Sequence, residues 1–167
     1  MTDVLVPTMP FSPAKSQLSE VMTEVVFRHQ IRVVSRHNGK EQMLLVGADD
    51  LVAMLAGQEF DVRVVFDEGE VTTFVEGLDV LGFGETLDEA IEDLLNKLRE
   101  YTTRYFQDLT KYLATSRRTH GALLLRFALV DEAGQRAMLG LSADSNANLA
   151  GEAGAHKPAG AELALSR

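Results

Sequence analysis

The apolar positions of this chain follow helical spacing in its first part. A stripe at three- and four-residue intervals is formed by Leu18, Val21, Met22, Val25 and Val26. This spacing predicts an amphipathic helix. Ser12 and Pro13 precede the stripe. They favour a helix start because a serine hydroxyl caps free N–H groups and proline suits the first helical position.

A hairpin and a short helix are predicted next. Residues 31–35 are rich in β-branched side chains and predict a strand, and residues 43–46 predict its return strand. Between them, Asn38-Gly39 is the pair favoured in a tight turn whose two central residues have positive φ. The acidic pair Asp49-Asp50 then opens a short helix.

The second part of the chain begins with strand spacing and continues as a helix. Every second position of residues 60–66 is Phe or Val, which predicts a half-buried strand. A turn at residues 67–70 and further strands at 71–75 and 79–83 complete a small antiparallel sheet. Thr86 and Glu89 form a capping box that opens a long helix reaching about residue 113.

The last third of the chain predicts less structure. Residues 122–130 are so apolar that two short helices and a hairpin both fit, although Ala and Leu favour helices over strands. Residues 142–167 are mostly Ala, Gly, Ser and Asn, which predicts a disordered tail. The predicted fold class is therefore α+β. Its domains are residues 1–57 and 58–141, followed by the tail.

Several motifs of the first part occur in a fixed order. They are S-x-A-K-x-x-L-S at residues 12–19, S-R-x-N-G at 35–39, a strand at 43–46 and an acidic helix start at 49–51. In this order they resemble the N-terminal domain of the Phd/YefM antitoxin family. Pro13 and Leu51 stand where that family usually has Glu and Tyr. The resemblance implies a domain of helix, β-hairpin and short helix, with a short strand before it at residues 4–6 or 8–9.

A second resemblance covers residues 60–101. Strand, acidic turn and strand are followed by G-x-G-E-T-x-x-E-A, carried by Gly82, Gly84, Glu85, Thr86, Glu89 and Ala90. This order is similar to the HicB-like α/β fold, the antitoxin half of another toxin system. The alternative is that this is an ordinary β-β-β-α unit, which has the same order of elements without any relationship to the HicB-like fold. A lone G-x-G among acidic residues is weak evidence for phosphate binding.

Charge is distributed unevenly between the two parts. The chain has a formal net charge of −9, of which residues 1–57 carry −1 and residues 58–167 carry −8. The basic residues of the first part cluster at its helix start and around its hairpin. Such a cluster either contacts phosphates or is a solvated face. The Phd/YefM resemblance implies DNA contacts at Lys15 and Arg36, and charge and position add Arg32, His37 and Lys40.

The first part is too small to form a good core by itself. About 45 residues bury little surface when alone, so the apolar stripe and the hairpin predict a homodimer with a shared core. The predicted dimer residues are Leu18, Val21, Met22, Val25 and Val33. The Phd/YefM resemblance implies the same, since its members dimerise through this domain and bind an operator palindrome.

No pattern of catalytic residues is present. There is no Cys, and no His stands beside another ligand at metal-binding spacing. No serine lies in a G-x-S-x-G turn. We therefore expect neither an enzyme nor a bound metal or cofactor. The absence of a signal sequence and of a long apolar run predicts a cytoplasmic protein without a membrane segment.

Two functions follow from these patterns. The first is an antitoxin that represses its own operon through the N-terminal dimer and neutralises a cognate toxin through its acidic C-terminal part. The toxin is then a small basic ribonuclease of the RelE kind, because the negative charge of residues 58–167 complements it. The alternative is a dimeric interaction or regulatory module without a toxin. Phd/YefM members usually end in a flexible toxin-binding segment, whereas a second folded unit is predicted here.

Overall fold

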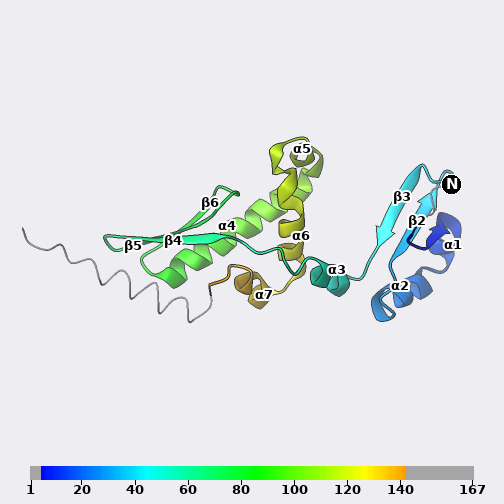
Figure 1. Ribbon diagram of the computed structural model, residues 1–167, viewed down its shortest axis with the longest axis horizontal. Helices are drawn as coiled ribbons and strands as arrows, with labels where there is room; N and C mark the ends of the chain where they lie inside the picture. The colour runs from blue at the N-terminus through cyan, green and yellow to red at the C-terminus, as the bar shows by residue number, and fades with distance from the viewer. Residues whose placement is uncertain (1–4, 142–167) are drawn as a thin grey trace, which may run out of the picture. The chain divides into compact units, whose positions relative to one another are not determined.

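The computed structural model describes residues 5–141, which form two compact units divided between Gln58 and Glu59 (Figure 1). Each unit combines a small sheet with helices, so the predicted α+β class is confirmed. The tail predicted at residues 142–167 lies outside the described residues. Among residues 5–141, no helix has the combined length and apolar character needed to cross a membrane.

The N-terminal unit contains a mixed sheet in the order β1-β2-β3. Strand β1 (Thr8–Pro10) runs parallel to β2 (Arg32–Arg36), and β2 pairs antiparallel with β3 (Glu41–Leu45). Helices α1 (Phe11–Ser16) and α2 (Leu18–Phe27) connect the two parallel strands. Helix α3 (Ala48–Met54) follows the hairpin, with both predicted acidic residues in its first turn.

The helix start differs from the one predicted. Pro10 occupies the cap position with extended backbone, and no side chain caps the helix, so Ser12 lies inside α1. The reason is tertiary: Pro10 is paired with Ser35 in the sheet, so the chain stays extended up to that residue. The predicted single helix is also interrupted at Gln17, where α1 ends and α2 begins.

The hairpin loop is longer than the predicted two-residue turn. Asn38 and Gly39 have positive φ as expected, but His37 has positive φ as well. The last strand pair is Arg36 with Glu41, which leaves four residues in the loop. The basic residues on either side of Asn38-Gly39 therefore lie in or beside an exposed loop at the tip of the hairpin.

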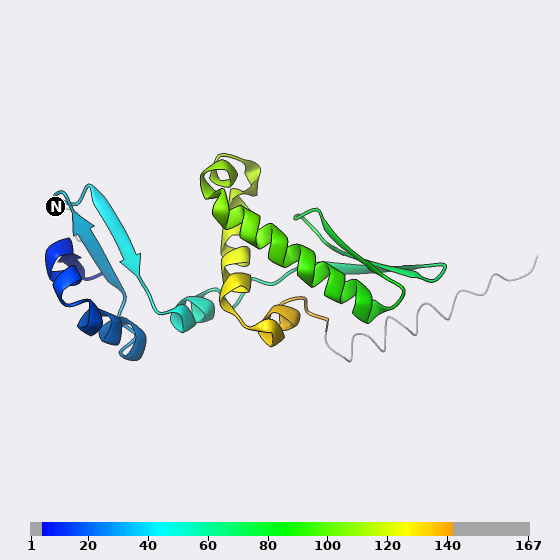
Figure 2. The ribbon, with the colours of Figure 1, turned by 180° about the vertical axis from the view of Figure 1, so that it is seen from behind.

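The C-terminal unit contains an antiparallel sheet in the order β4-β5-β6, next to one long helix (Figures 1 and 2). The strands are β4 (Val62–Asp67), β5 (Glu70–Val75) and β6 (Val80–Gly84). Helix α4 (Leu87–Gln107) packs against β6 and β5. The chain continues through α5 (Leu109–Leu113), the 3₁₀ helix η1 (Ser116–His120), α6 (Gly121–Leu129) and α7 (Glu132–Ala137).

Helix α4 begins as predicted and ends earlier than predicted. The Thr86–Glu89 capping box is present in both directions. The helix breaks at Asp108, and α5 then changes direction so that Tyr112 stacks on Tyr105 with ring centroids 4.7 Å apart. The open choice for residues 122–130 is settled as helix α6, which packs against α4.

Two glycines bring α4 unusually close to β6. A Cβ on Gly82 would lie 2.3 Å from the Ala90 carbonyl oxygen, and one on Gly84 would lie 2.5 Å from the Ala90 nitrogen. The buried Thr73 hydroxyl donates a hydrogen bond of 3.0 Å to the same Ala90 oxygen. The G-x-G pattern is thus explained by helix–sheet packing, because only glycine permits this backbone approach.

Candidate functional site

The hairpin tip and the start of α1 lie side by side in the N-terminal unit. The Arg36 guanidinium lies over the Phe11 ring, 5.8 Å from its centroid. An open hollow of about 540 Å³ is lined by residues from the start of α1 and from the hairpin tip, among them Phe11, Arg36 and His37. The structure therefore brings together the start of α1 and the hairpin tip, two segments that the sequence analysis predicts to bind DNA.

The five candidate DNA-binding residues differ in how free their side chains are. Lys15, in the last turn of α1, and Lys40, in the hairpin loop, are exposed and form no ion pair with any residue in the described range. Arg36 pairs with Glu41 at the surface, and His37 lies 3.9 Å from the same carboxylate. Arg32 is half-buried and donates 2.8 Å and 2.6 Å hydrogen bonds to Glu24 and Gln30.

These environments rank the candidates. A half-buried arginine that already has two acceptors gives them up only at a cost, whereas an exposed ion pair contributes little and exchanges easily. Lys15, Lys40 and Arg36 are therefore the groups best placed to meet a phosphate. Arg32 is the least available of the five, because it links α2 to the start of β2.

The apolar stripe of α2 divides into two faces. Val21 and Val25 are buried inside the unit at 3% and 6% exposure, and Val33 is half-buried in β2. Leu18, Met22 and Val26 form a separate row at four-residue spacing and are 52%, 57% and 47% exposed. Of the predicted dimer residues, Leu18 and Met22 thus offer free apolar surface, whereas Val21 and Val25 are used by the unit's own core.

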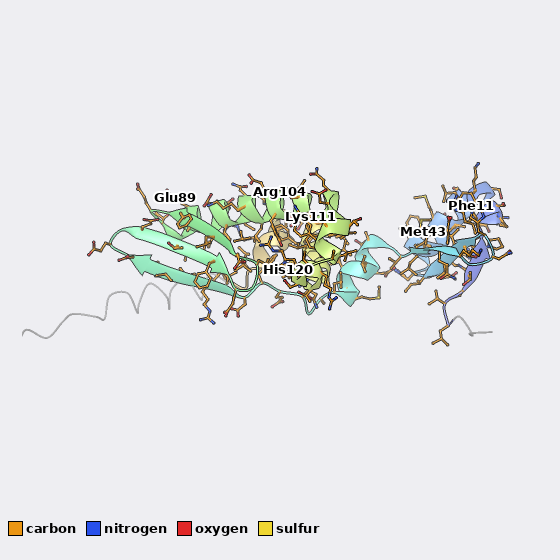
Figure 3. The ribbon with its side chains drawn as sticks, turned by 90° about the horizontal axis from the view of Figure 1, so that it is seen from above. Phe11, Met43, Glu89, Arg104, Lys111 and His120 are labelled. Atoms are coloured by element: carbon orange, nitrogen blue, oxygen red, sulfur yellow. The ribbon has the colours of Figure 1, made fainter. Side chains whose placement is uncertain are left out.

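Further exposed apolar residues extend beyond the α2 row. They lie at the end of α2, on β3 and on α3, and comprise Phe27, Met43, Leu44 and Met54 (Met43 is labelled in Figure 3). Within the described part of the N-terminal unit, the buried apolar side chains are Ala14, Val21, Val25 and Val34. So much exposed apolar surface over so small a core is typical of a chain that completes its core with a partner. Sequence reasoning missed Phe27, although it directly follows Val26.

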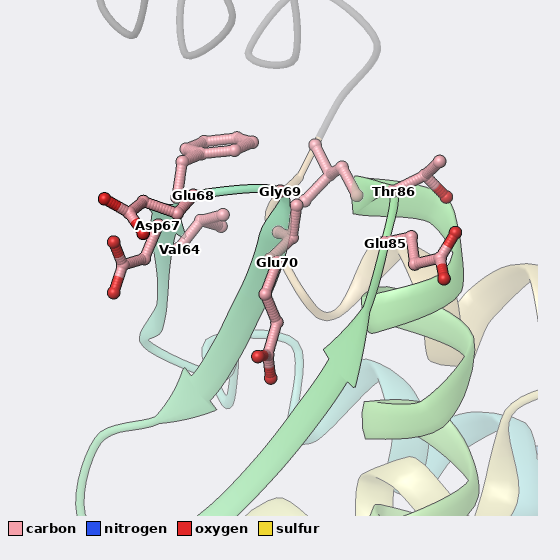
Figure 4. Close-up of a pocket in the computed structure, with 10 residues that line it drawn as sticks. Val64, Asp67, Glu68, Gly69, Glu70, Glu85 and Thr86 are labelled. Atoms are coloured by element: carbon pink, nitrogen blue, oxygen red, sulfur yellow. The ribbon is translucent and has the colours of Figure 1, made fainter.

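The C-terminal unit has an acidic end where β4 turns into β5 and α4 begins (Figure 4). An open hollow of about 640 Å³ there has an apolar floor of Val64, Phe66, Val71 and Leu87. Its rim is formed by the acidic residues Asp67, Glu68, Glu70 and Glu85. In the part of the chain that the structure describes, none of these four joins an ion pair. Sequence reasoning found the acidic turn but could not place it over an apolar hollow.

The opposite end of α4 is richer in basic and aromatic side chains. Figure 3 marks Glu89 and Arg104 towards the two ends of the helix, with Lys111 and His120 near the Arg104 end. Tyr101 and His120 share a 2.8 Å hydrogen bond. Burial lowers the pKa of His120, and the positive charge of Arg117 acts in the same direction. This pair belongs to the packing between α4 and η1. Within residues 5–141, no three acidic or histidine side chains gather as a metal site would require.

Three comparisons with known proteins bear on this arrangement. A family model, PHD-like, described as the antitoxin of a RelE/RelB toxin–antitoxin system, matches residues 6–139. No curated protein matches the sequence. A crystal structure from Syntrophomonas wolfei subsp. wolfei, described as the antitoxin part of a proposed toxin/antitoxin system, has a TM-score of 0.69 at 20% identity. The similarity covers 78% of this chain and 94% of that one, so it includes parts of both units.

Proposed function

The chain belongs to the PHD-like family of antitoxins of toxin–antitoxin systems, and from this membership we propose how its two units divide the work. The N-terminal unit dimerises and binds operator DNA, which represses the antitoxin's own operon in the cytoplasm. The C-terminal unit neutralises the cognate toxin. The observation that carries the antitoxin function is the family match over residues 6–139. The division between the units is supported by the exposed apolar row of α2 and by the uneven distribution of charge. Membership of this family indicates a regulatory protein rather than an enzyme.

The dimer is supported by the exposed row of α2. Leu18, Met22 and Val26 present one continuous apolar edge of a helix, and each is about half exposed. Two such edges packed together remove that surface from water, which is the main favourable term in protein association. This dimer is of the Phd/YefM kind that the sequence motifs suggest. It places two copies of the hairpin tip in one assembly.

Operator binding is supported by exposed cations on α1 and at the hairpin tip. Lys15 and Lys40 form no ion pair with any described residue, and Arg36 is held by a surface ion pair with Glu41 and by its contact with the Phe11 ring. Phosphate contacts of this kind provide affinity that falls with salt, because each contact releases counterions from the DNA. The N-terminal unit lacks the strong negative charge of the rest of the chain, so it approaches DNA with the least repulsion.

The choice of toxin follows from charge. Residues 58–167 carry a net charge of −8, and a partner that handles RNA is typically basic. We therefore propose a small basic ribonuclease of the RelE kind. The C-terminal unit is folded before it meets this partner, so it binds as a preformed surface rather than as a segment that folds onto the toxin.

Co-expression with the adjacent reading frame tests the proposal. We expect the small protein encoded next to this chain to stop growth alone, and this chain to bind it and restore growth. If the neighbour is harmless or does not bind, the toxin-free alternative, a dimeric regulatory module, is favoured instead. The binding half of the experiment is a pull-down of the two full-length proteins.

Removing two cations tests operator binding. We expect Lys15→Ala and Arg36→Ala each to weaken binding to the chain's own promoter DNA. If both residues contact phosphate in each half of a dimer, log Kobs falls against log salt with a slope of at least about −3.6. Each substitution removes two contacts per dimer and reduces the slope by about 1.8. Arg32→Ala is the matched control, because its guanidinium is already occupied by Glu24 and Gln30. Unchanged slopes in all three variants would place the DNA elsewhere.

A further inference from the structure

Strand β4 is the outer strand of the C-terminal sheet on the side away from α4. The sheet order is β4-β5-β6, and α4 packs against β6 and β5. The two outer strands of this sheet differ in their hydrogen bonds to α4. On β6, the Phe83 N–H donates a 2.9 Å hydrogen bond to the Asp93 carboxylate of α4. The same carboxylate accepts a 2.6 Å hydrogen bond from the Lys97 ammonium group. One outward N–H group of the β6 edge is therefore satisfied by the helix.

The register shows which groups the β4 edge leaves open. The Glu76 N–H donates a 2.9 Å hydrogen bond to the Asp61 carbonyl oxygen. In an antiparallel ladder hydrogen-bonded pairs alternate, so Asp61, Arg63 and Val65 direct their N–H and C=O groups towards β5. The N–H and C=O groups of the alternate residues then point outward. The Phe60 N–H also points outward, and it donates a 3.0 Å hydrogen bond to the Met138 carbonyl oxygen. For Val62, Val64 and Phe66, no described residue provides a partner on that side.

Two of these three residues also face the acidic hollow. Val64 and Phe66 form part of its floor, and Phe66 remains 39% exposed. A strand added beside β4 would hydrogen-bond to the open edge, and its alternate side chains would enter the hollow. At the turn end, it would pass the carboxylates of Asp67 and Glu68. An open edge, an apolar floor and unpaired acidic groups thus meet along one strand.

We propose that the β4 edge is the docking site for an extended segment of the basic toxin, which adds to the sheet as a further strand. This inference rests on the proposed antitoxin function and specifies its contact surface. The segment carries apolar side chains at alternate positions and Lys or Arg where it passes the turn. Backbone hydrogen bonds supply the affinity, and the acidic rim selects a cationic sequence.

Charge favours this occupant over a second copy of the chain. In an antiparallel β4–β4 pair centred on Val64, the register would place Asp67 of one copy beside Asp61 of the other. Like charges opposite one another destabilise a strand pair. Residues 142–167 are no better matched, since their charged residues are three acidic and two basic ones. A basic partner neutralises the unpaired carboxylates, whereas a second copy of the chain or residues 142–167 would not.

Two variants block the edge in different ways. Val64→Pro removes an outward N–H and introduces a ring at the edge, a position where proline is tolerated because no ladder bond is lost. Glu68→Lys with Glu70→Lys replaces two of the four rim carboxylates by ammonium groups, which brings the summed charge of the rim from −4 to 0 and changes no residue of β4. We expect Val64→Pro to weaken the Kd for the purified product of the adjacent reading frame at least about tenfold. We expect the double lysine substitution to weaken it about tenfold at low salt and less at high salt.

Matched controls keep these effects specific. Glu100→Lys with Glu132→Lys changes the net charge by the same amount at two other exposed sites. Val65→Lys alters the opposite face of β4, where that side chain is 49% exposed, and leaves the edge open. Both controls are expected to bind like the wild type. Circular dichroism of each variant establishes that its secondary structure is retained.

Residue-resolved hydrogen exchange gives a direct readout on the full-length wild type. The amides of Val62, Val64 and Phe66 should exchange quickly in the free protein and at least about tenfold more slowly in the complex. If the wild type binds but both blocking variants bind equally well and these amides stay fast, docking occurs elsewhere while the antitoxin function stands.

Other outcomes overturn the proposal in other ways. If the wild type does not bind the neighbouring protein at all, the proposed function and the edge proposal fail together. If the edge amides are already slow in the free protein and speed up when residues 142–167 are deleted, the chain's own tail occupies the edge. If Val64→Pro halves the mass of the free protein in solution, a second copy occupies it.

Discussion

Leu18→Gln with Met22→Gln is expected to convert the protein from a dimer to a monomer and to abolish operator binding. Both side chains lie in the exposed row of α2 and are about half exposed within one chain. Burying the remaining half of each is worth about 1 kcal/mol, and a symmetric dimer contains four of them. The loss of about 4 kcal/mol corresponds to a roughly thousandfold weaker dimer. Analytical ultracentrifugation over a range of concentrations measures this change.

The control uses the neighbouring polar face of the same helix. Ser19 and Thr23 are exposed one position further along, and the Thr23 hydroxyl donates to the Ser19 carbonyl. Ser19→Gln with Thr23→Gln therefore makes the same replacement without removing apolar surface. This variant should remain dimeric and bind DNA. A dimer that survives the Leu18 and Met22 changes would place the interface on other exposed apolar residues, such as Met43 and Leu44 of β3.

Gly82→Ala is expected to destabilise the C-terminal unit by about 3 kcal/mol, as for an overpacked core. The added Cβ would lie 2.3 Å from the Ala90 oxygen and 2.6 Å from the Leu94 nitrogen. Both are backbone atoms of α4, so the helix must move rather than a side chain. The chain has three tyrosines and no tryptophan. All three tyrosines lie on α4 and α5, so tyrosine fluorescence during urea unfolding reports on this unit alone.

Gly77→Ala is the matched control in the same unit. Its Cβ would meet nothing within 4 Å, but its φ of +85° is unfavourable for alanine. We expect a loss of only about 1 kcal/mol from that backbone strain. In the growth assay, Gly82→Ala should lose toxin neutralisation while the purified protein still binds operator DNA. Equal stability of the two variants would mean that the close approach of β6 and α4 is not needed for folding.

The elements set by local interactions could be predicted from the sequence. The capping box of Thr86 and Glu89 satisfies helix N–H groups three residues away, so it needs no knowledge of the fold. The alternation of residues 60–66 identifies β4 because one face of a strand is buried at every second position. The positive φ of Asn38 and Gly39 follows from their own chemistry.

The break positions of the helices could not be predicted in this way. Ser12 failed to cap α1 because β1 pairs with β2 and keeps Pro10 extended. Helix α4 ends at Gln107 because the chain turns there to stack Tyr112 on Tyr105, a contact formed between separate helices. Both outcomes depend on residues that are distant in space or on another element, and local propensity contains no information about them.

For the candidate site, the sequence determined the segments and the tertiary structure decided their use. The α2 stripe was evident from its spacing, but only packing separated the buried Val21 and Val25 from the exposed Leu18 and Met22. Periodicity identifies an apolar stripe without saying which part of it faces the chain's own core. From the sequence, Arg32 counts as a cation available to DNA. In the fold its guanidinium lies 2.8 Å from the Glu24 carboxylate, so it already has a partner. The open edge of β4 is likewise a property of strand order and register, which arise from long-range pairing.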